Sequence, residues 1–127
     1  MPARACPCDT GKPYAVCCGP WHGGEAAPDA LALMRSRYSA YVLGDEDYLL
    51  ATWHPDTRPE PGSLELGDGT RWLRLKILGH GQDAPERAWV EFSAAFRQGG
   101  GSAQRLHERS LFLKQNGRWV YHSGRFS

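Results

Sequence analysis

The amino-acid sequence predicts an α+β fold, with helices packed on the concave face of a curved antiparallel sheet. Residues 30–53 carry helical patterns, whereas residues 71–123 carry strand patterns that end in a tight hairpin. Helices that come before a run of strands are typical of this class, in which the helices cover one face of the sheet. A cysteine-rich segment precedes both. We therefore expect a small knot with its connector over residues 1–28 and an α+β domain over 29–127.

A first helix is expected over Ala30–Leu43, because this stretch contains neither glycine nor proline. Asp29 is a suitable N-cap, and Gly44 can take the left-handed conformation that often follows a helix. A second, shorter helix is expected over Glu46–Trp53, with Asp45 as its N-cap. Both stretches carry apolar side chains at helical spacing, so each has a face that can pack on a sheet.

Four strands are expected in the second half of the chain. Their ranges are Arg71–Leu78, Arg87–Phe96, Arg105–Gln115 and Arg118–Ser123, with a loop over Gly79–Glu86. In the first strand Leu73, Leu75 and Ile77 alternate with other residues, a period of two that is typical of a half-buried strand. This alternation predicts that Trp72 lies on the opposite face.

Asn116 and Gly117 form the strongest hairpin signal in the chain, because this pair favours a two-residue turn. The register that follows pairs Gln115 with Arg118, Phe112 with Tyr121, and Leu111 with His122. One face of this hairpin then carries Glu108, Ser110, Phe112, Trp119 and Tyr121. We expect this face to be the one that contacts the helices.

The composition is that of an ordinary globular protein. Hydrophobic residues make up 41% of the 127-residue chain and charged residues 23%, which is enough for one proper core. The formal net charge of +1 gives no electrostatic reason to expect nucleic-acid binding. No apolar run approaches the roughly 20 residues that a membrane-spanning helix needs. We therefore expect neither a nucleic acid nor a membrane as a partner.

All four cysteines lie in one short stretch, at Cys6, Cys8, Cys17 and Cys18. Two disulfides, as in small secreted scaffolds, compete with one zinc ion held by four thiolates. Residues 1–5 lack the apolar run of a signal peptide, so we expect a cytoplasmic protein with reduced thiols. Neither Cys6 with Cys8 nor Cys17 with Cys18 can bridge easily without strain, whereas both pairs can turn onto one metal. Zinc is therefore the expected cofactor.

The residues between the two cysteine pairs support a small zinc knot. Gly11 can adopt a positive φ and Pro13 fixes its own φ, so residues 9–13 favour a turn that brings the pairs together. His22 is the main rival ligand, because neutral imidazole also binds zinc. Four cysteines already complete a tetrahedron, so we expect His22 beside the site or at the surface.

The cysteine-rich stretch resembles the SEC-C motif, which is named from the zinc-binding tail of the SecA translocase. The matching positions are Cys6, Cys8, Gly11, Lys12, Tyr14, Cys17 and Cys18. Asp9 and Thr10 differ from the commoner Gly-Ser pair of the motif, a conservative change at turn positions. This resemblance implies zinc binding and implies no particular activity.

The rest of the chain resembles the YchJ family of uncharacterised bacterial proteins. The matching segments are Leu33–Tyr41, Tyr48–Arg58, Val90–Phe92, His107–Phe112 and Trp119–Tyr121. The resemblance implies a domain like nuclear transport factor 2, a cone of bent sheet with helices across its mouth. Leu111 departs from the family, which usually has a basic residue there. No cysteine follows Cys18, so the second SEC-C motif of some relatives is not expected.

The open end of such a cone usually forms a pocket, the default place for a binding site. The side chains that can line it are Arg35, Arg37, Tyr38, Trp53, His54, Arg58, Glu108, Trp119 and Tyr121. Less specific roles compete with this one, because aromatic residues such as Trp53 are often core and His54 can simply favour a helix C-terminus. Glu108 can pair with Arg35 or Arg37, since a buried carboxylate needs a partner.

Three functions remain open. The zinc knot can dock on a protein or ribosomal surface, the cone can bind a small molecule or act as an enzyme, and basic residues can bind nucleic acid. The low net charge makes the last the weakest, and no phosphate loop or nucleophile–base spacing supports an enzyme. A large cavity with convergent histidine, arginine and glutamate would favour the small molecule. A filled cone with an exposed apolar patch beside the zinc would favour docking, which is the function we expect.

Overall fold

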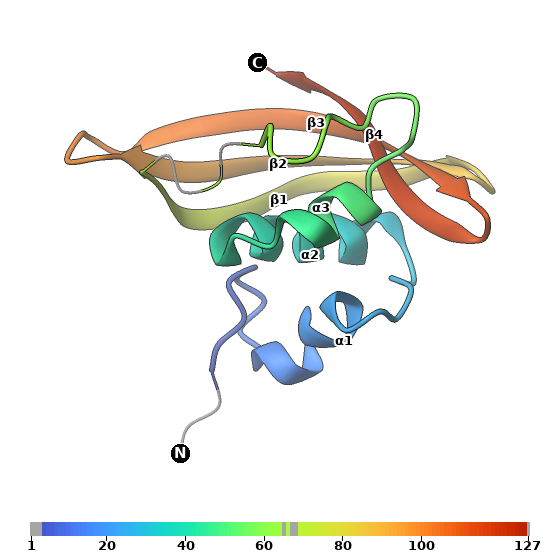
Figure 1. The fold of residues 1–127 in the computed structure, drawn as a ribbon, viewed down its shortest axis with the longest axis horizontal. Helices are drawn as coiled ribbons and strands as arrows, with labels where there is room; N and C mark the ends of the chain where they lie inside the picture. The colour runs from blue at the N-terminus through green and yellow to red at the C-terminus, as the bar shows by residue number, and fades with distance from the viewer. Residues whose placement is uncertain (1–3, 65, 67–68, 127) are drawn as a thin grey trace.

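The computed structural model describes residues 4–64, 66 and 69–126, and Figure 1 shows a curved sheet with helices along one face. Its helical elements are η1 (Tyr14–Val16), α1 (Gly19–His22), α2 (Ala30–Leu43) and α3 (Glu46–Ala51). Its strands are β1 (Thr70–Ala84), β2 (Arg87–Gln98), β3 (Gln104–Gln115) and β4 (Arg118–Phe126). The α+β class expected from the sequence is confirmed. Within these described residues, no helix is both long and apolar enough to cross a membrane.

The two main helices begin at the expected caps. Asp29 Oδ1 accepts a hydrogen bond from the Ala32 amide at 2.7 Å, and Asp45 Oδ1 accepts one from the Tyr48 amide at 3.1 Å. Gly44 follows α2 in the left-handed conformation, with a φ of 74°. The capping residues therefore fix where both helices start and where α2 stops.

Helix α3 ends at Ala51 rather than at Trp53, where the sequence pattern placed its end. The chain turns instead toward β4, where Trp53 and Tyr121 form an isolated parallel bridge. The His54 amide donates to the Tyr121 carbonyl at 2.7 Å, and the Tyr121 amide donates to the Thr52 carbonyl at 2.8 Å. This long-range pairing replaces the last helical turn and brings Trp53 to the sheet.

The strands lie in the order β1-β2-β3-β4, and each pairs with the next in antiparallel fashion. Strand β1 continues to Ala84, through most of the range Gly79–Glu86 that was expected to be a loop. The glycines in this range make room for an aromatic ring rather than a turn. A side chain at Gly81 would meet the Trp89 indole nitrogen at 2.8 Å, and one at Gly79 would meet the same ring at 3.6 Å. The expectation of a loop was therefore wrong, because these glycines lie in a strand and face the Trp89 ring.

A bulge in β1 changes which side chains face the helices. The register shifts between Trp72 and Arg74, so Trp72 points to the same side as Leu75, and Leu73 is left 39% exposed. The Trp72 ring lies 6.0 Å from the Tyr38 ring of α2. The expectation that Trp72 lies on the opposite face was therefore wrong. A strict alternation of apolar residues gives no sign of a bulge.

The hairpin of β3 and β4 has the expected turn, and two of its three expected pairs are confirmed. Gln115 pairs with Arg118 and Phe112 pairs with Tyr121. The third pair is wrong, because a bulge beside Phe112 sets Leu111 opposite Ser123 instead of His122. The expected inner face is largely buried, with four of its residues below a tenth exposed, namely Glu108, Ser110, Phe112 and Trp119.

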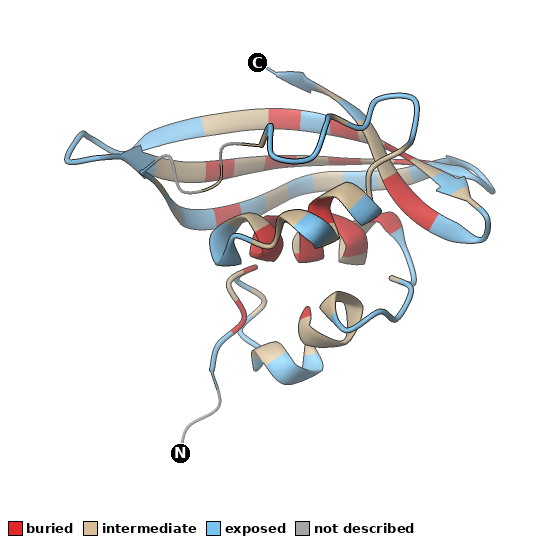
Figure 2. Cartoon of the chain, viewed as in Figure 1, coloured by how far each residue is buried: buried red, intermediate tan, exposed pale blue. Residues whose placement is uncertain are grey.

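The buried core extends from the sheet through α2 to the N-terminal segment, residues 4–28. Figure 2 shows buried positions on α2 and on the strands above it. Cys6, Cys8 and Cys18 belong to the same buried cluster as Tyr38 and Phe112. Helix α2 is thus covered on two sides, which lets it bury small polar residues as well as apolar ones. The division of the chain at residue 28 stays a prediction.

Candidate functional site

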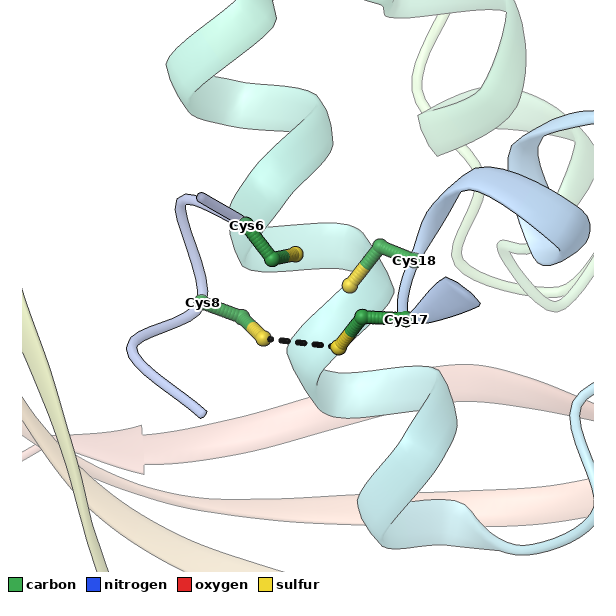
Figure 3. Close-up of side chains that lie close together, drawn as sticks. All are labelled: Cys6, Cys8, Cys17 and Cys18. Carbon is green, nitrogen blue, oxygen red and sulfur yellow. Dashed lines mark hydrogen bonds between the residues drawn. The ribbon is translucent and has the colours of Figure 1, made fainter. Parts of the chain in front are cut away.

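The four cysteine side chains converge on one point beside α2, as Figure 3 shows. Their sulfur atoms all lie within 4.8 Å of one another, and those of Cys8 and Cys17 are 3.5 Å apart. None of the four takes part in a disulfide. Four thiols at such distances are the donor set of a tetrahedral structural metal site. These residues therefore form a cluster suited to hold one metal ion, and we call it the cysteine cluster.

A tight loop in the backbone brings the two cysteine pairs together. The Cys6 amide donates to the Lys12 carbonyl at 2.9 Å, which closes the segment between the pairs. Gly11 adopts the expected positive φ, at 83°, and Asp9 is also left-handed, with a φ of 65°. The turn residues of the sequence therefore have the conformational role predicted for them.

Hydroxyl groups and burial set the electrostatics of the cysteine cluster. The Thr10 hydroxyl lies 3.1 Å from Cys17 Sγ, and the Ser39 hydroxyl donates to Cys18 Sγ at 3.3 Å. A hydrogen bond with Cys18 holds the pKa of Cys8 well below its ordinary value, although burial opposes this. The Cys18 pKa is raised, first by the same hydrogen bond and then by burial. Without an ion the cluster thus favours a thiolate at Cys8, and a cation would favour deprotonation of the others.

His22 supports the cysteine cluster from outside and is not one of its ligands. Its Nε2 lies 2.8 Å from the Ser36 carbonyl oxygen, so Nε2 must be the donor there. Nδ1 is then the acceptor for the Tyr14 hydroxyl, 2.6 Å away. Both ring nitrogens of His22 therefore form hydrogen bonds. His22 is not one of the residues whose ligand atoms come together in the cysteine cluster. The expectation that His22 lies beside the site is confirmed.

Two further contacts attach the loop to the α+β core. Arg35 Nη1 donates to the Cys8 carbonyl at 2.8 Å. Asp9 Oδ2 accepts a hydrogen bond from the Leu75 amide at 2.8 Å, next to the bulge of β1. Arg35 therefore serves the cysteine cluster, and its expected place in the pocket is wrong.

A cavity of about 400 Å³ lies between α2 and the inner face of the sheet. Its wall is mostly apolar and aromatic, with Met34, Tyr38, Tyr41, Trp72, Phe92, Ala94, Leu106 and Phe126. The polar contributors are Arg37, Trp53, Glu108, Ser110 and Tyr121. A concave, largely apolar space with a few polar groups is the usual form of a small-molecule site. We call this space the cavity.

Arg37 is the charged residue at the helix side of the cavity, and only 4% of it is exposed. Its Nη1 donates to the Leu49 carbonyl at 2.8 Å and to the Thr52 hydroxyl at 2.7 Å. Its guanidinium carbon lies 4.8 Å from the centre of the Trp53 ring and 4.7 Å from that of Tyr121. Burial lowers the Arg37 pKa from its ordinary value.

Glu108 lies on the sheet side of the cavity and is 7% exposed. Its Oε2 accepts hydrogen bonds from the Ser110 hydroxyl and, at 3.3 Å, from the Tyr121 hydroxyl. The expected ion pair with Arg35 or Arg37 is absent from the pairs that the described residues form. Burial raises the Glu108 pKa, while the two hydroxyls and the more distant Arg37 lower it.

Gly124 on β4 makes space for the Glu108 carboxylate. A Cβ atom at Gly124 would lie only 2.5 Å from the Glu108 carboxyl carbon. The residue is opposite Ser110 in the sheet, so the missing side chain leaves a slot that the carboxylate fills. Sequence reasoning missed Gly124, because a glycine at the end of a strand carries no sign of what it faces.

Five of the nine predicted pocket residues line the cavity, and four lie elsewhere. Those in the cavity are Arg37, Tyr38, Trp53, Glu108 and Tyr121. Beside Arg35, the misplaced ones are Arg58, which donates to the Trp53 carbonyl, and Trp119, which is buried under Lys114. His54 Nδ1 accepts the Asp56 amide, and its ring lies 5.2 Å from that of His122.

Other cavity residues escaped the sequence analysis, among them Tyr41 and Trp72. Tyr41 lies one turn after Arg37 on α2. Trp72 reaches the cavity only because of the bulge in β1. The spacing of Arg37 and Tyr41 could have identified the first, whereas no signal in the sequence marks the second.

The cysteine cluster and the curved sheet define a class, a SEC-C motif followed by a domain like nuclear transport factor 2. The SEC-C motif model matches residues 5–20. The model of the YchJ middle domain, described as like nuclear transport factor 2, matches residues 29–124. The chain therefore belongs to the YchJ family, whose curated members carry the designation UPF0225.

Relatives and solved structures resemble the chain over nearly its whole length. A UPF0225 protein of Xanthomonas oryzae is 53% identical over 121 residues, which is 95% of this chain and 94% of that one. The solution structure of a SEC-C motif containing protein from Rhodopseudomonas palustris is 40% identical, with a TM-score of 0.81 over 96% of this chain and 98% of that one. A crystal structure of a SEC-C motif containing protein from Psychrobacter arcticus is 30% identical, with a TM-score of 0.83 over 98% and 83%.

Proposed function

We propose that the protein holds one structural zinc ion in the cysteine cluster and binds a small organic ligand in the cavity. The observation that carries the second part is the Trp53 indole nitrogen. This atom faces no hydrogen-bond partner although it is buried, the only such side-chain atom within the described residues. Trp53 also lines the cavity. A buried donor without a partner is costly, so a ligand that accepts from it is favoured.

Zinc is the preferred ion because of the donor set. Four thiolates suit a soft, tetrahedral ion, and zinc fills such sites without redox chemistry. Elemental analysis of the purified protein should give close to one equivalent of zinc per chain. Less than about a tenth of an equivalent together with no titratable thiols would contradict the proposal, since that result is expected of disulfides.

The cavity can be tested by filling it. Ala94 lines the cavity, whereas its neighbour Ala95 does not. Ala94→Leu should abolish binding of an apolar fluorescent probe such as anilinonaphthalene sulfonate, and Ala95→Leu should leave it unchanged. Native mass spectrometry of the freshly purified protein should also show a bound small molecule. Equal probe binding by the two variants would contradict a binding site in the cavity.

A docking function for the cysteine cluster is a second candidate, supported by one observation. Val16, beside the cluster, is 69% exposed, so it presents an apolar side chain at the surface of this segment. A protein or ribosomal surface is the kind of partner that would cover it. Val16→Asp should then reduce co-sedimentation with ribosomes while zinc content stays the same. Docking is the weaker of the two candidates. A cone filled by its own side chains would have favoured docking, whereas this domain contains a cavity.

A further inference from the structure

Resting on the proposed ligand-binding function, we infer that the ligand is a small carboxylic acid with an apolar body, bound as its anion. The carboxylate lies against the Arg37 guanidinium and the Trp53 indole N–H. The apolar body fills the rest of the cavity.

The first argument is the uncompensated charge of Arg37. A buried guanidinium is expected to have a counter-ion, because burying a lone charge is costly. None of the ion pairs within the described residues includes Arg37. Its hydrogen bonds to Leu49 and Thr52 both use Nη1, and its guanidinium also interacts with the Tyr41 hydroxyl, so these partners are all neutral. A carboxylate ligand would supply the missing counter-ion, because a guanidinium is a planar fork that binds a carboxylate through two parallel hydrogen bonds.

The second argument is the position of Trp53 next to this cation. The guanidinium carbon of Arg37 lies 4.8 Å from the ring centre, and the indole N–H has no acceptor of its own. Both residues line the cavity, so a ligand acceptor placed between them would meet a cation and a donor that has no partner. A neutral hydrocarbon would satisfy neither of them, and an amine would add a second positive charge beside Arg37.

The third argument concerns Glu108, which forms no ion pair with Arg37 among the described residues, although the two groups interact at longer range. Its Oε2 accepts from both Ser110 and Tyr121, so the free oxygen, Oε1, is where a proton can reside. The Tyr121 ring lies against the guanidinium of Arg37 while its hydroxyl reaches Glu108, which keeps the two charged groups apart. A protonated Glu108 can donate a hydrogen bond to a ligand carboxylate, as a neutral buried acid does in other sites.

The shape of the cavity supplies the rest of the ligand. Most of its wall is apolar, and at about 400 Å³ it is at the lower end of the range for small-molecule sites. Rings of Tyr38, Trp72 and Phe92 suit an aromatic or aliphatic body that has no further charge. A long or highly polar acid does not fit this description.

The experiment uses three matched probe series with the zinc-loaded protein. Phenyl, cyclohexyl and n-hexyl bodies are each offered as the propionic acid, the corresponding alcohol and the corresponding amine, and binding is measured by calorimetry. At least one acid should bind, its alcohol at least about tenfold more weakly, and its amine not at all. Equal binding of the acid and the alcohol would overturn the inference and leave ligand binding in place. Failure of all nine probes would overturn the proposed function itself.

Variants locate the carboxylate within the cavity. Trp53→Phe keeps the aromatic ring and removes the N–H, so it should weaken the acid about fivefold to tenfold and leave the alcohol unaffected. Arg37→Met should abolish acid binding, whereas Arg118→Met, at an exposed arginine, should not. Glu108→Gln keeps a neutral donor and should retain acid binding. If Glu108 were the counter-ion of Arg37, this last variant would bind the acid at least tenfold more tightly, which would overturn the third argument.

Discussion

The cysteine cluster and the cavity differ in how far apart their residues are in the chain. The cluster comes from residues 6–18, and a single tight loop assembles it. The cavity collects side chains from α2, from Trp53 just after α3 and from all four strands. A local site depends on spacing and turn chemistry, whereas a dispersed site depends on strand register. An error of one residue in a predicted strand register therefore leaves the predicted cysteine cluster unchanged. The same error changes which side chains are predicted to line the cavity.

The largest expected effect comes from removing one ligand of the cysteine cluster. Cys8→Ser should lower the zinc content and the unfolding midpoint, by about 15 °C or more, because metal binding contributes directly to folding. The loss should reach beyond the N-terminal segment, since Cys6, Cys8 and Cys18 share a buried cluster with Met34 and Tyr38. Amide exchange of α2 residues is the measurement.

If α2 keeps its protection in Cys8→Ser, then the cluster and the cavity are independent units, contrary to the shared core. A matched control is Val16→Ser, because Val16 is exposed and lies in the same segment. This control should keep both the zinc and the unfolding midpoint.

The next largest effect should come from the slot that holds Glu108. Gly124→Ala places a methyl group where the carboxylate lies, so Glu108 must move. Overpacking of this kind costs about 1–3 kcal/mol of unfolding free energy. Gly100→Ala is the control, because a Cβ atom there meets nothing within 4 Å. Urea denaturation compares the two variants.

The same substitution should be tolerated once the carboxylate is removed. In the background of Glu108→Ala, Gly124→Ala should cost less than in the wild type, since the two changes share one contact. Additive costs would show that Gly124 has some other role.

A moderate effect concerns pH. Burial raises the Glu108 pKa above its ordinary 4.5, so the folded state binds more protons than the unfolded state as the pH rises past that value. The stabilisation from a protonated Glu108 is therefore lost as the pH rises through the raised pKa. Glu108→Gln does not titrate, so the free energy of unfolding of the wild type should fall relative to this variant as the pH rises from 4.5 through the raised pKa.

The groups that face Glu108 do not obscure this test. They are Arg37 and Tyr41 of α2 and Tyr121 of β4, and arginine keeps its charge in this range. The Tyr41 and Tyr121 pKa values are raised further from neutrality, mainly by burial. A difference between wild type and variant that stays constant or grows with pH would contradict the prediction.

The smallest effect should come from the contact between the cysteine loop and β1. Asp9→Ala removes the acceptor for the Leu75 amide, which should cost about 1 kcal/mol, the usual net value of a hydrogen bond, and it also places alanine at a positive φ. Asp9→Asn keeps an acceptor oxygen and tolerates the positive φ, so its cost should be smaller. Amide exchange at Leu75 measures the contact directly, and unchanged protection in Asp9→Ala would contradict it.

Local signals in the sequence predicted much of this architecture. The caps at Asp29 and Asp45, the helix end at Gly44 and the turn at Asn116 each act within a few residues, and all four are present in the structure. The cysteine cluster belongs to the same group, because its geometry depends on one short loop.

The missed features all depend on long-range contacts. Trp72 faces the cavity because of a bulge, and Trp53 leaves α3 because it pairs with Tyr121 on a distant strand. Gly81 reads as a loop residue but is needed under the Trp89 ring. In each case the partner is chosen by the tertiary structure, so periodicity and propensity carry no information about it.

Helix α2 holds Arg35 against the cysteine loop and Arg37 in the cavity, two residues further along. Each residue advances an α-helix by about 100°. Inserting a single residue between Arg35 and Arg37 would rotate one arginine relative to the other by that angle, so the loop and the cavity could not both keep their arginines. An insertion scan of α2 should therefore find no tolerated site between these two arginines.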